Sequence, residues 1–550
     1  MVVDGAKHIH LIKCDSDDKY LEVKRIIEKD LLNKLKIESL LDTNGKLTNS
    51  GILFCPVKSN NERNPRGVDF FVERINEDFG DVSKPYYSDE NNRIINARNF
   101  QDNKFPLLVA TKGYGMGIDK PNIRYTIHVN LPPSIEAFYQ EAGRAGRDGN
   151  KSECYIVYSS EYDERNNKLM DINTSLNEVH SLCNRPHKWD DFSCLFNFHN
   201  RTFKGKKDEM SIIKGILDDI GDLEQEYQPY RSKFEHIDVN LKGDELFKAK
   251  QKAIFRLTAI GVITNYGVDF ASNEFSLKIN QITKENIISH YYDYVKKYNQ
   301  LRANKEKEIL INQTNLNINE FIISCCDLFL NYVYDYYEKG RRQALATMFN
   351  SLEKALRSTE PDKLFREEVS NFLKRTYSKQ LVNIANAKNT AEMMSQIREL
   401  FEGSGDSKSL IKPVSDNKSL FGQISRTLED SPESMGLFLL RAFTGAKINE
   451  DINQVWKDIE RFLRLSFKKY NFSKNENYPI LCESMYRIIK IRENLGLELC
   501  KKLIDKIRDN KFTEQLIEYL DDKKISLEYG KLILIKEIYK ELENNIYGGK

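Results

Sequence analysis

Apolar residues in the first third of the chain follow two patterns in turn. Short apolar runs bounded by turn residues are typical of buried strands, whereas apolar residues that recur every three or four positions indicate helices. Strands are predicted at 8–13, 51–56, 84–88, 107–110, 125–129 and 151–159. Helices are predicted between them, at 20–35, 66–79 and 91–100 and from about residue 134. Strands that alternate with helices favour an α/β domain built on a doubly wound parallel sheet.

The pattern changes after residue 160. Residues 160–235 are expected to be mainly helix and loop. The segment 244–261 has one apolar face and predicts a helix, and alternating stretches at 266–270 and 275–279 predict a hairpin. A helix followed by a two-stranded hairpin is the second half of a winged helix. The polar side of this helix either contacts phosphates or stays hydrated; it carries Lys248, Lys250, Lys252 and Arg256.

The remainder of the chain is predicted to be almost entirely helical. Four tyrosines at 291, 292, 294 and 298 either stack on single-stranded bases or pack a helix against its neighbours, and the helical spacing favours the second. Successive helix pairs suggest a solenoid, although no fixed sequence period accompanies them. The predicted domains are an α/β domain at 1–160, a helical linker region at 161–235, a winged-helix-like module at 236–300, a helical domain at 301–402, a linker at 403–418 and a C-terminal helical domain at 419–550.

Composition constrains the setting of the protein. The 550 residues include 84 Lys+Arg and 82 Asp+Glu, so any nucleic-acid surface must be a local basic patch. No apolar run approaches the roughly 20 residues that a membrane-spanning helix needs. The nine cysteines are scattered without framework spacing, and the first residues lack a secretory pattern. We therefore expect a cytoplasmic protein with reduced thiols and no membrane partner.

Cysteine and histidine side chains gather between residues 183 and 199. Cys183, His187, Cys194 and His199 have a spacing that is not a standard set of zinc ligands, and the apolar residues around them are typical of a core. We expect these side chains to be packed or exposed, and the prediction is that no metal is bound.

The candidate chemistry lies between residues 107 and 149. The predicted strand 107–110 ends in a turn with glycines at 113, 115 and 117, which would let the backbone approach a ligand. Gln140, Arg144 and Arg147 follow on the next helix, which the glycines at 143, 146 and 149 should end. Two guanidiniums beside small residues either bind an anion such as phosphate or pair with surface carboxylates. The glycine context favours phosphate.

These two segments carry a family resemblance. The stretches Ala-Thr-Lys-Gly-Tyr-Gly-Met-Gly-Ile-Asp-Lys-Pro at 110–121 and Gln-Glu-Ala-Gly-Arg-Ala-Gly-Arg-Asp-Gly at 140–149 resemble motifs V and VI of the RecQ-like branch of superfamily two helicases. The resemblance is close over 84–158 and looser over 8–83. Proteins of that family clamp ATP, with Mg²⁺, between two RecA-like domains, so the resemblance implies that residues 1–160 form the second of these domains.

The resemblance also implies roles for individual residues. Arg147 would be the arginine finger on the γ-phosphate, with Arg144 and Gln140 assisting. Gly117 and Asp119 would line the ATP-facing side, and Thr111 the DNA-facing side. In the loop after the second strand, where motif IV lies in the family, Lys58 and Ser59 would lie near the DNA backbone, or would belong to an ordinary hydrated loop.

Two motifs that such an enzyme needs are missing from the sequence. It contains no Gly-x-x-x-x-Gly-Lys-Ser/Thr phosphate loop and no Asp-Glu-x-His or Asp-Glu-x-Asp box, both of which belong to the first RecA-like domain. We therefore expect a fragment, a trimmed chain or one half of a split motor that is inactive alone. Its expected partners are DNA, a first RecA-like domain from the same gene or a separate chain, and a protein bound to the helical half.

Two functions are consistent with these observations. In the first, the chain supplies the arginine finger and accessory DNA-binding domains of an ATP-dependent helicase with 3′→5′ polarity. In the second, it is a non-catalytic DNA- or protein-binding module from a truncated or split helicase.

Overall fold

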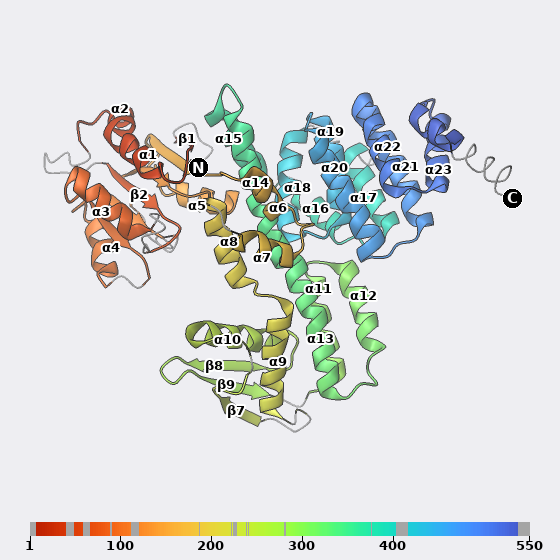
Figure 1. Ribbon diagram of the computed structural model, residues 1–550, viewed down its shortest axis with the longest axis horizontal. Helices are drawn as coiled ribbons and strands as arrows, with labels where there is room; N and C mark the ends of the chain where they lie inside the picture. The colour runs from red at the N-terminus through yellow and green to blue at the C-terminus, as the bar shows by residue number, and fades with distance from the viewer. Residues whose placement is uncertain are drawn as a thin grey trace. The chain divides into compact units, whose positions relative to one another are not determined.

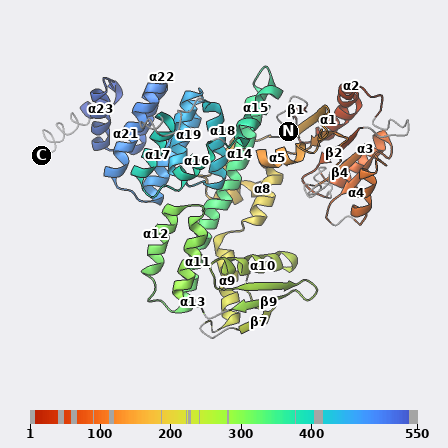
Figure 2. The same ribbon diagram turned by 180° about the vertical axis from the view of Figure 1, so that it is seen from behind.

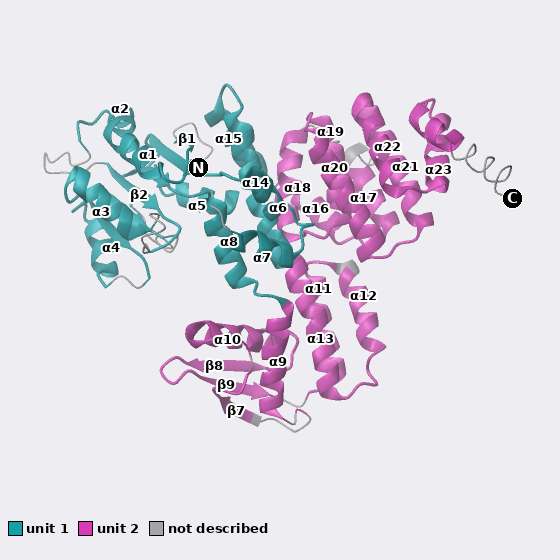
Figure 3. Cartoon of the chain, in the orientation of Figure 1, with its two compact units in different colours: residues 1–205, 337–373 teal, residues 206–336, 374–550 magenta. Residues whose placement is uncertain are grey.

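Two compact units make up the chain in the computed structural model (Figure 3). Unit 1 comprises residues 1–205 and 337–373, and unit 2 comprises residues 206–336 and 374–550. This grouping differs from the predicted domain boundaries, because 337–373 belongs with the first unit. The structure describes residues 7–39, 49–58, 67–88, 91–111, 120–185, 188–221, 223, 228–237, 239, 241–279, 282–375, 377–402 and 416–536.

A six-stranded sheet forms the centre of unit 1. Its strand order is β1-β6-β5-β2-β4-β3, and every pairing between neighbours is parallel. The expected parallel α/β RecA-like sheet is therefore confirmed. The strands are β1 (Lys7–Lys13), β2 (Ser50–Phe54), β3 (Ser83–Tyr86), β4 (Leu107–Ala110), β5 (Ile123–His128) and β6 (Ser152–Tyr158), close to their predicted positions.

One face of this sheet is covered by helices from the start of the chain. The predicted helix at 20–35 consists of α1 (Lys19–Arg25), a wide π-helical turn η1 (Ile26–Asp30) and α2 (Leu31–Leu35). The wide turn lets two successive isoleucines, Ile26 and Ile27, both enter the core. Together with α3 (Val68–Phe79), these helices bury the side chains of β2, β4 and β5 that point to this face (Figure 1).

The opposite face is covered by helices from two distant parts of the chain. The core on this side includes Phe138, Phe192, Phe349 and Phe365, all buried. Figure 2 shows these helices from behind. They are α4 (Arg93–Gln101), α5 (Ile135–Ala142), α6 (Asp163–Met170), α7 (Leu176–Asn184), α8 (Asp191–Thr202), α14 (Lys339–Leu356) and α15 (Pro361–Leu373).

The edge strand β1 is bonded directly to this returning segment. The backbone N–H of Ile9 donates to a carboxylate oxygen of Asp362 at 2.9 Å, across 353 positions of sequence. The Glu353 carboxylate accepts from Lys13 at 2.8 Å and from the Tyr158 hydroxyl at 2.9 Å. Helices α14 and α15 are therefore structural parts of the sheet domain.

Unit 2 begins with a small α+β module. It contains α9 (Lys206–Ile220), β7 (Gln228–Ser232), α10 (Gly243–Ala259), β8 (Asn265–Asp269) and β9 (Glu274–Ile279). The hairpin predicted from alternation is confirmed, because β8 and β9 pair antiparallel. Strand β7 was not predicted, since 228–232 lies in the region expected to be helix and loop; its partner is β9, a non-local pairing.

The basic residues of α10 mostly have partners inside this module. Lys250 is buried and donates to the carbonyl of Lys233 at 2.8 Å. Lys252 and the buried Arg256 pair with Glu209 of α9 at 2.5 Å and 3.5 Å. Both alternatives, phosphate contact and a hydrated face, are therefore wrong for the buried Lys250 and Arg256, whereas Lys252 is partly exposed. Lys248 lies on the surface, 3.8 Å from Asp244.

Helices form the rest of unit 2. They are α11 (Lys284–Lys296), α12 (Gln300–Ile311), α13 (Ile318–Val333), α16 (Ser378–Ala385), α17 (Thr390–Glu402), α18 (Asn417–Asp430), α19 (Met435–Lys447), α20 (Ile452–Leu463), α21 (Lys474–Ile491), α22 (Glu493–Ile507) and α23 (Asn510–Asp522). The π-helical turn η2 (Tyr334–Glu338) follows α13, and η3 (Arg464–Lys469) follows α20. Most of the predicted linker, 403–415, lies outside the described residues. The large helical region is confirmed, whereas a solenoid arrangement stays a prediction.

Charged and aromatic side chains meet in the core of unit 2. Arg302 is 3% exposed and pairs with Glu306 and Glu433, each at 2.8 Å. The buried Tyr291 donates to Glu306, and Tyr294 lies edge-on to Phe329 with ring centroids 5.1 Å apart. These two tyrosines therefore pack inside the unit, as helical spacing predicted.

Candidate nucleotide and nucleic-acid sites

The two candidate arginines lie just beyond the end of α5. The helix begins after Ser134, whose hydroxyl accepts from the backbone N–H of Ala137 at 3.1 Å, and it ends at Ala142. The chain then continues in tighter turns, in which Arg144 N–H donates to the Glu141 carbonyl at 3.2 Å. This pattern ends before Arg147, because the intervening Gly146 has φ of +64° and its N–H donates to the carbonyl of Ile123 instead of to the turn.

Neighbouring residues in this turn differ in how deeply their side chains are buried. Gln140 and Arg147 are exposed, and Arg144 is half-buried. Ala145, between the two arginines, is completely buried in a cluster that includes Ile52 of β2 and Leu108 of β4. The turn is thus anchored to the sheet through its smallest side chain, while its long side chains extend outward.

Gly146 fixes the turn to the start of two strands. Its backbone N–H donates to the carbonyl of Ile123 at 2.8 Å. Its φ is +64°, and a Cβ at this position would lie 2.7 Å from the hydroxyl oxygen of Ser152. Only glycine meets both requirements without strain. The arginine turn therefore lies at the amino edge of the sheet, defined as the edge where β5 and β6 begin.

An ion pair next to Arg147 fastens the same turn. Both guanidinium ends of Arg124 donate to the Asp148 carboxylate, at 3.0 Å and 2.5 Å. Asp148 also accepts from the backbone and side chain of Asn150, at 3.1 Å and 2.9 Å. The Arg124 guanidinium, with Asn150, lowers the pKa of Asp148 to about 2. Sequence analysis missed Arg124, although a single charged residue in the otherwise uncharged strand β5 is a signal that could have identified it.

The other candidate residues lie at the opposite edge. Thr111 directly follows β4 and is half-buried, with its N–H donating to the Tyr86 carbonyl at 3.2 Å. Lys58 follows β2, is exposed, and its carbonyl accepts from Asp69 N–H at 3.1 Å. Because the strands are parallel, both residues lie at the carboxyl edge of the sheet. The structure therefore does not bring them together with Arg147.

Three of the predicted site residues, Ser59, Gly117 and Asp119, lie outside the described residues. Lys120, the next residue after the glycine segment, is 2% exposed and donates to Asn103. Burial lowers the pKa of the Lys120 ammonium to about 8. Lys120 lies just before β5 and therefore at the amino edge.

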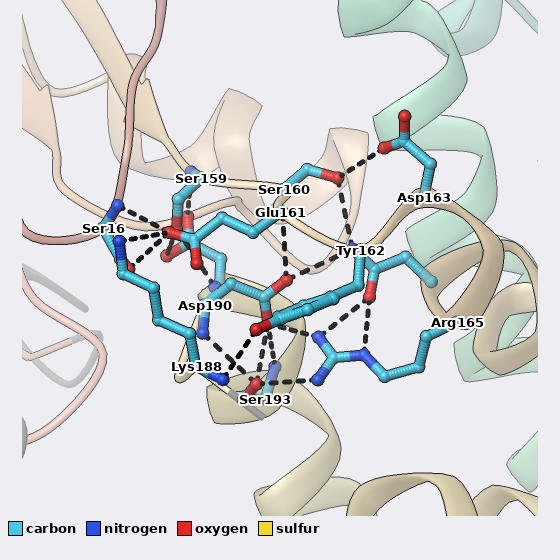
Figure 4. A network of polar contacts seen from close by, with 12 residues as sticks. Ser16, Ser159, Ser160, Glu161, Tyr162, Asp163, Arg165, Lys188, Asp190 and Ser193 are labelled. Carbon is cyan, nitrogen blue, oxygen red and sulfur yellow. Dashed lines mark hydrogen bonds and ion pairs between the residues drawn. The ribbon is translucent and has the colours of Figure 1, made fainter. Parts of the chain in front are cut away.

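Two buried aspartates fasten helix α8 to the strand ends. Asp191 is completely buried, accepts from Leu131 N–H at 2.8 Å and from Ser159 N–H at 3.1 Å, and pairs with Lys19. Figure 4 shows its neighbour Asp190, which pairs with Arg165 at 2.5 Å and accepts from Ser193 N–H at 2.9 Å. With every carboxylate oxygen bonded, this cluster serves to position α8.

A cavity of about 530 Å³ lies between α8, α14 and the carboxyl edge. In its wall the His128 imidazole lies 3.2 Å from the Glu141 carboxylate, and His199 is 2.9 Å from Glu338 nearby. Most of the other lining residues are apolar: Phe54, Cys55, Pro56, Leu131, Pro132, Pro133, Cys194, Leu195, Phe196, Phe198, Ala344 and Leu345. The cavity wall continues through Pro56 toward Lys58, so it belongs to the same edge of the sheet.

Two of the residues considered as metal ligands, Cys194 and His199, line this cavity, and His199 also contacts Glu338. His187 lies outside the described residues. Within the part of the chain that the structure describes, no three His, Cys, Asp or Glu side chains are grouped so that they could hold a metal ion. No described helix is both long and apolar enough to cross a bilayer.

Comparison with known proteins identifies the sheet domain. A family profile described as the helicase conserved C-terminal domain matches residues 34–149. The RecQ-like DNA helicase blm-1 of Caenorhabditis elegans is 43% identical over 93 residues, which are 17% of this chain and 9% of that protein. The ATP-dependent DNA helicase RecQ of Bacillus subtilis is 52% identical over 60 residues, 11% of this chain and 10% of that protein.

A viral protein is also similar to this chain over a short segment. A putative ATP-dependent RNA helicase of Acanthamoeba polyphaga mimivirus is 56% identical over 61 residues, 11% of this chain and 11% of that protein. The matches to these three relatives thus span about a tenth of each relative's length. Residues 34–149 therefore match the helicase conserved C-terminal domain, and the relatives found over this part of the chain include RecQ-like DNA helicases.

Proposed function

We propose that this chain supplies the second motor domain of an ATP-dependent DNA helicase, with Arg147 as its arginine finger. The observation that carries the proposal is an exposed guanidinium on a backbone turn that is anchored on both sides, by Gly146 and by Asp148. A cation held in this way can meet an anion that a second domain brings, and the backbone that carries it is already fixed before binding.

The chemistry of the donor set suits a triphosphate. Guanidinium binds phosphate oxygens in a bidentate manner and remains charged at every physiological pH. Arg147 would stabilise the charge that develops on the γ-phosphate during hydrolysis, with Arg144 and Gln140 assisting. In related phosphoryl-transfer enzymes, an arginine finger contributes roughly three to five orders of magnitude in rate.

The separation of the two edges supports a translocating motor. ATP would be held at the amino edge near Arg147, with Gly117 and Asp119 lining it. A DNA strand would lie at the carboxyl edge, near Thr111, Lys58 and Ser59. Both ligands could then be bound at once, and closure on ATP could move the strand. We propose DNA and 3′→5′ polarity by resemblance to the family; the viral relative named as an RNA helicase makes RNA the alternative to test.

The remaining catalytic groups would come from a first RecA-like domain, in the same protein or in another chain. The phosphate loop and the Asp-Glu box, which hold the phosphates and Mg²⁺, are not among these 550 residues. The exposed amino-edge candidates Gln140 and Arg147 are amide and cationic groups, which fit phosphate and not Mg²⁺, and the nearby Asp148 carboxylate is already bonded to Arg124 and Asn150. We therefore propose that the chain alone does not hydrolyse ATP.

The test is ATP turnover by this chain combined with a first RecA-like domain, in the presence of single-stranded DNA. The expected result is turnover by the wild type and a loss of about a thousandfold or more in Arg147→Ala. Arg147→Lys should recover only a small part of this loss, because an ammonium cannot bridge two phosphate oxygens. DNA binding, measured by fluorescence anisotropy, should stay within about twofold.

Arg25→Ala serves as a matched control, because Arg25 lies in the same unit but pairs with Glu22 and Asp30 on the surface of α1. It should leave turnover unchanged. Wild-type turnover in Arg147→Ala would remove this residue from the mechanism. If the combined protein binds DNA and never hydrolyses ATP, the chain is a non-catalytic binding module instead.

A further inference from the structure

We infer that Arg124 is a positioning residue for ATP hydrolysis, which it serves by holding Arg147 through Asp148. The inference rests on the proposed function and extends it to a residue outside both sequence motifs. Arg124 would touch neither nucleotide nor DNA. Its role would be to fix the one turn whose exposed side chain reaches the γ-phosphate.

The geometry around Arg124 joins three parts of the amino edge. Its guanidinium donates to both carboxylate oxygens of Asp148 and also to the carbonyls of Pro121 at 3.2 Å and Ile123 at 3.4 Å. Pro121 belongs to the segment that leaves the glycine turn, and Asp148 directly follows Arg147. The Arg124 side chain therefore links the chain at Pro121 to the arginine turn at Asp148.

The Arg124–Asp148 ion pair is partly shielded from water. The side chains of Arg124 and Asp148 are 13% and 24% exposed, so a planar bidentate contact is only partly screened by water. Two further bonds hold the same turn, from Gly146 N–H to Ile123 at 2.8 Å and from Gly149 N–H to Gly146 at 3.1 Å. Among the described contacts, the pair with Arg124 is the one that joins Asp148 to β5. Its loss would therefore release Asp148 from that strand. The main chain at Arg147 would then be held on one side only.

The test uses Arg124→Lys, which keeps the charge but cannot bridge two carboxylate oxygens. In the combined two-domain protein we expect kcat for ATP to fall about ten- to hundredfold, while KM for ATP changes less than about threefold. Asp148→Asn should have a similar effect. The double variant should be no worse than either single one, because both changes break the same contact.

Arg25→Lys is the matched control, since it makes the same substitution at a surface ion pair of the same unit, in which one guanidinium nitrogen of Arg25 donates to both oxygens of Asp30. It should change neither kcat nor KM. A loss of kcat that merely follows the fraction of folded protein, or additive losses in the double variant, would overturn the positioning role.

A second measurement does not depend on ATP turnover. Hydrogen exchange in the chain alone should become faster in the peptide covering residues 143–150 of Arg124→Lys, with the rest of unit 1 unchanged. Unchanged exchange in that peptide would refute the inference even if no ATPase is found. If Arg147→Ala abolishes turnover while Arg124→Lys behaves as wild type, the proposed function stands and only this inference fails.

Discussion

Arginine side chains have opposite surroundings in the two units. In unit 1, Arg147 is exposed at the tip of a turn whose backbone is tied to the sheet. In unit 2, Arg302 and Arg441 are buried and pair with carboxylates, Arg441 with Asp458 at 3.0 Å and 2.5 Å. A buried guanidinium holds carboxylates inside the fold, whereas the Arg147 guanidinium lies at the surface on an anchored backbone.

The strongest way to sharpen this comparison is to remove a buried cation. Arg302→Ala should lower the free energy of unfolding by about 3–5 kcal/mol, because Glu306 and Glu433 would remain buried without their partner. Arg147→Ala should change it by less than about 0.5 kcal/mol. Denaturant unfolding of both variants provides the measurement. Equal effects would show that exposure does not distinguish the two arginines.

A smaller effect is expected from the backbone of the turn itself. Gly146→Ala should destabilise unit 1 by about 1–3 kcal/mol, through left-handed backbone strain and the close approach to Ser152. Gly149→Ala is the control, since Gly149 has φ of +81° but nothing within 4 Å of an added Cβ. Its cost should be limited to the strain. Equal melting temperatures for the two variants would show that the close approach of a Cβ at position 146 to Ser152 adds no cost.

The smallest effect concerns pH. The Asp148 pKa is lowered to about 2, chiefly by Arg124, so its ion pair contributes stability above the ordinary aspartate pKa and loses it as the pH falls toward 2. The contribution should stay below about 1 kcal/mol, because the pair is partly exposed. The difference in melting temperature between wild type and Asp148→Asn should therefore shrink between about pH 4 and pH 2. A difference that does not change over this range would mean that the pair adds no stability.

Local sequence signals predicted most of the sheet domain. Strand β4 was predicted at 107–110 and is observed there, because a short apolar run before glycines has few alternatives. The start of α5 at Ser134 and its end near Gly143 follow from a capping hydroxyl and from glycine. These features depend on neighbours in the chain, which a single sequence displays directly.

Features that depend on distant partners were not predicted. The Arg124–Asp148 pair, the contacts of Asp191 and the pairing of β7 with β9 each join segments with no shared local pattern. The same limit explains why lysines on α10 were assigned to solvent or phosphate, although Lys250 and Lys252 bind within the module. Periodicity identifies the polar side of a helix but not what lies opposite it.

The bond between Ile9 and Asp362 has a consequence for how the protein is made. A ribosome completes β1 first and reaches Asp362 only 353 residues later, roughly 20–70 s at ordinary elongation rates. During that interval the nascent sheet has an edge strand without the helix that later bonds to it, and exposed edges recruit other strands. Production of soluble protein should therefore respond to elongation rate and chaperone supply more strongly than the stability of the finished fold would suggest.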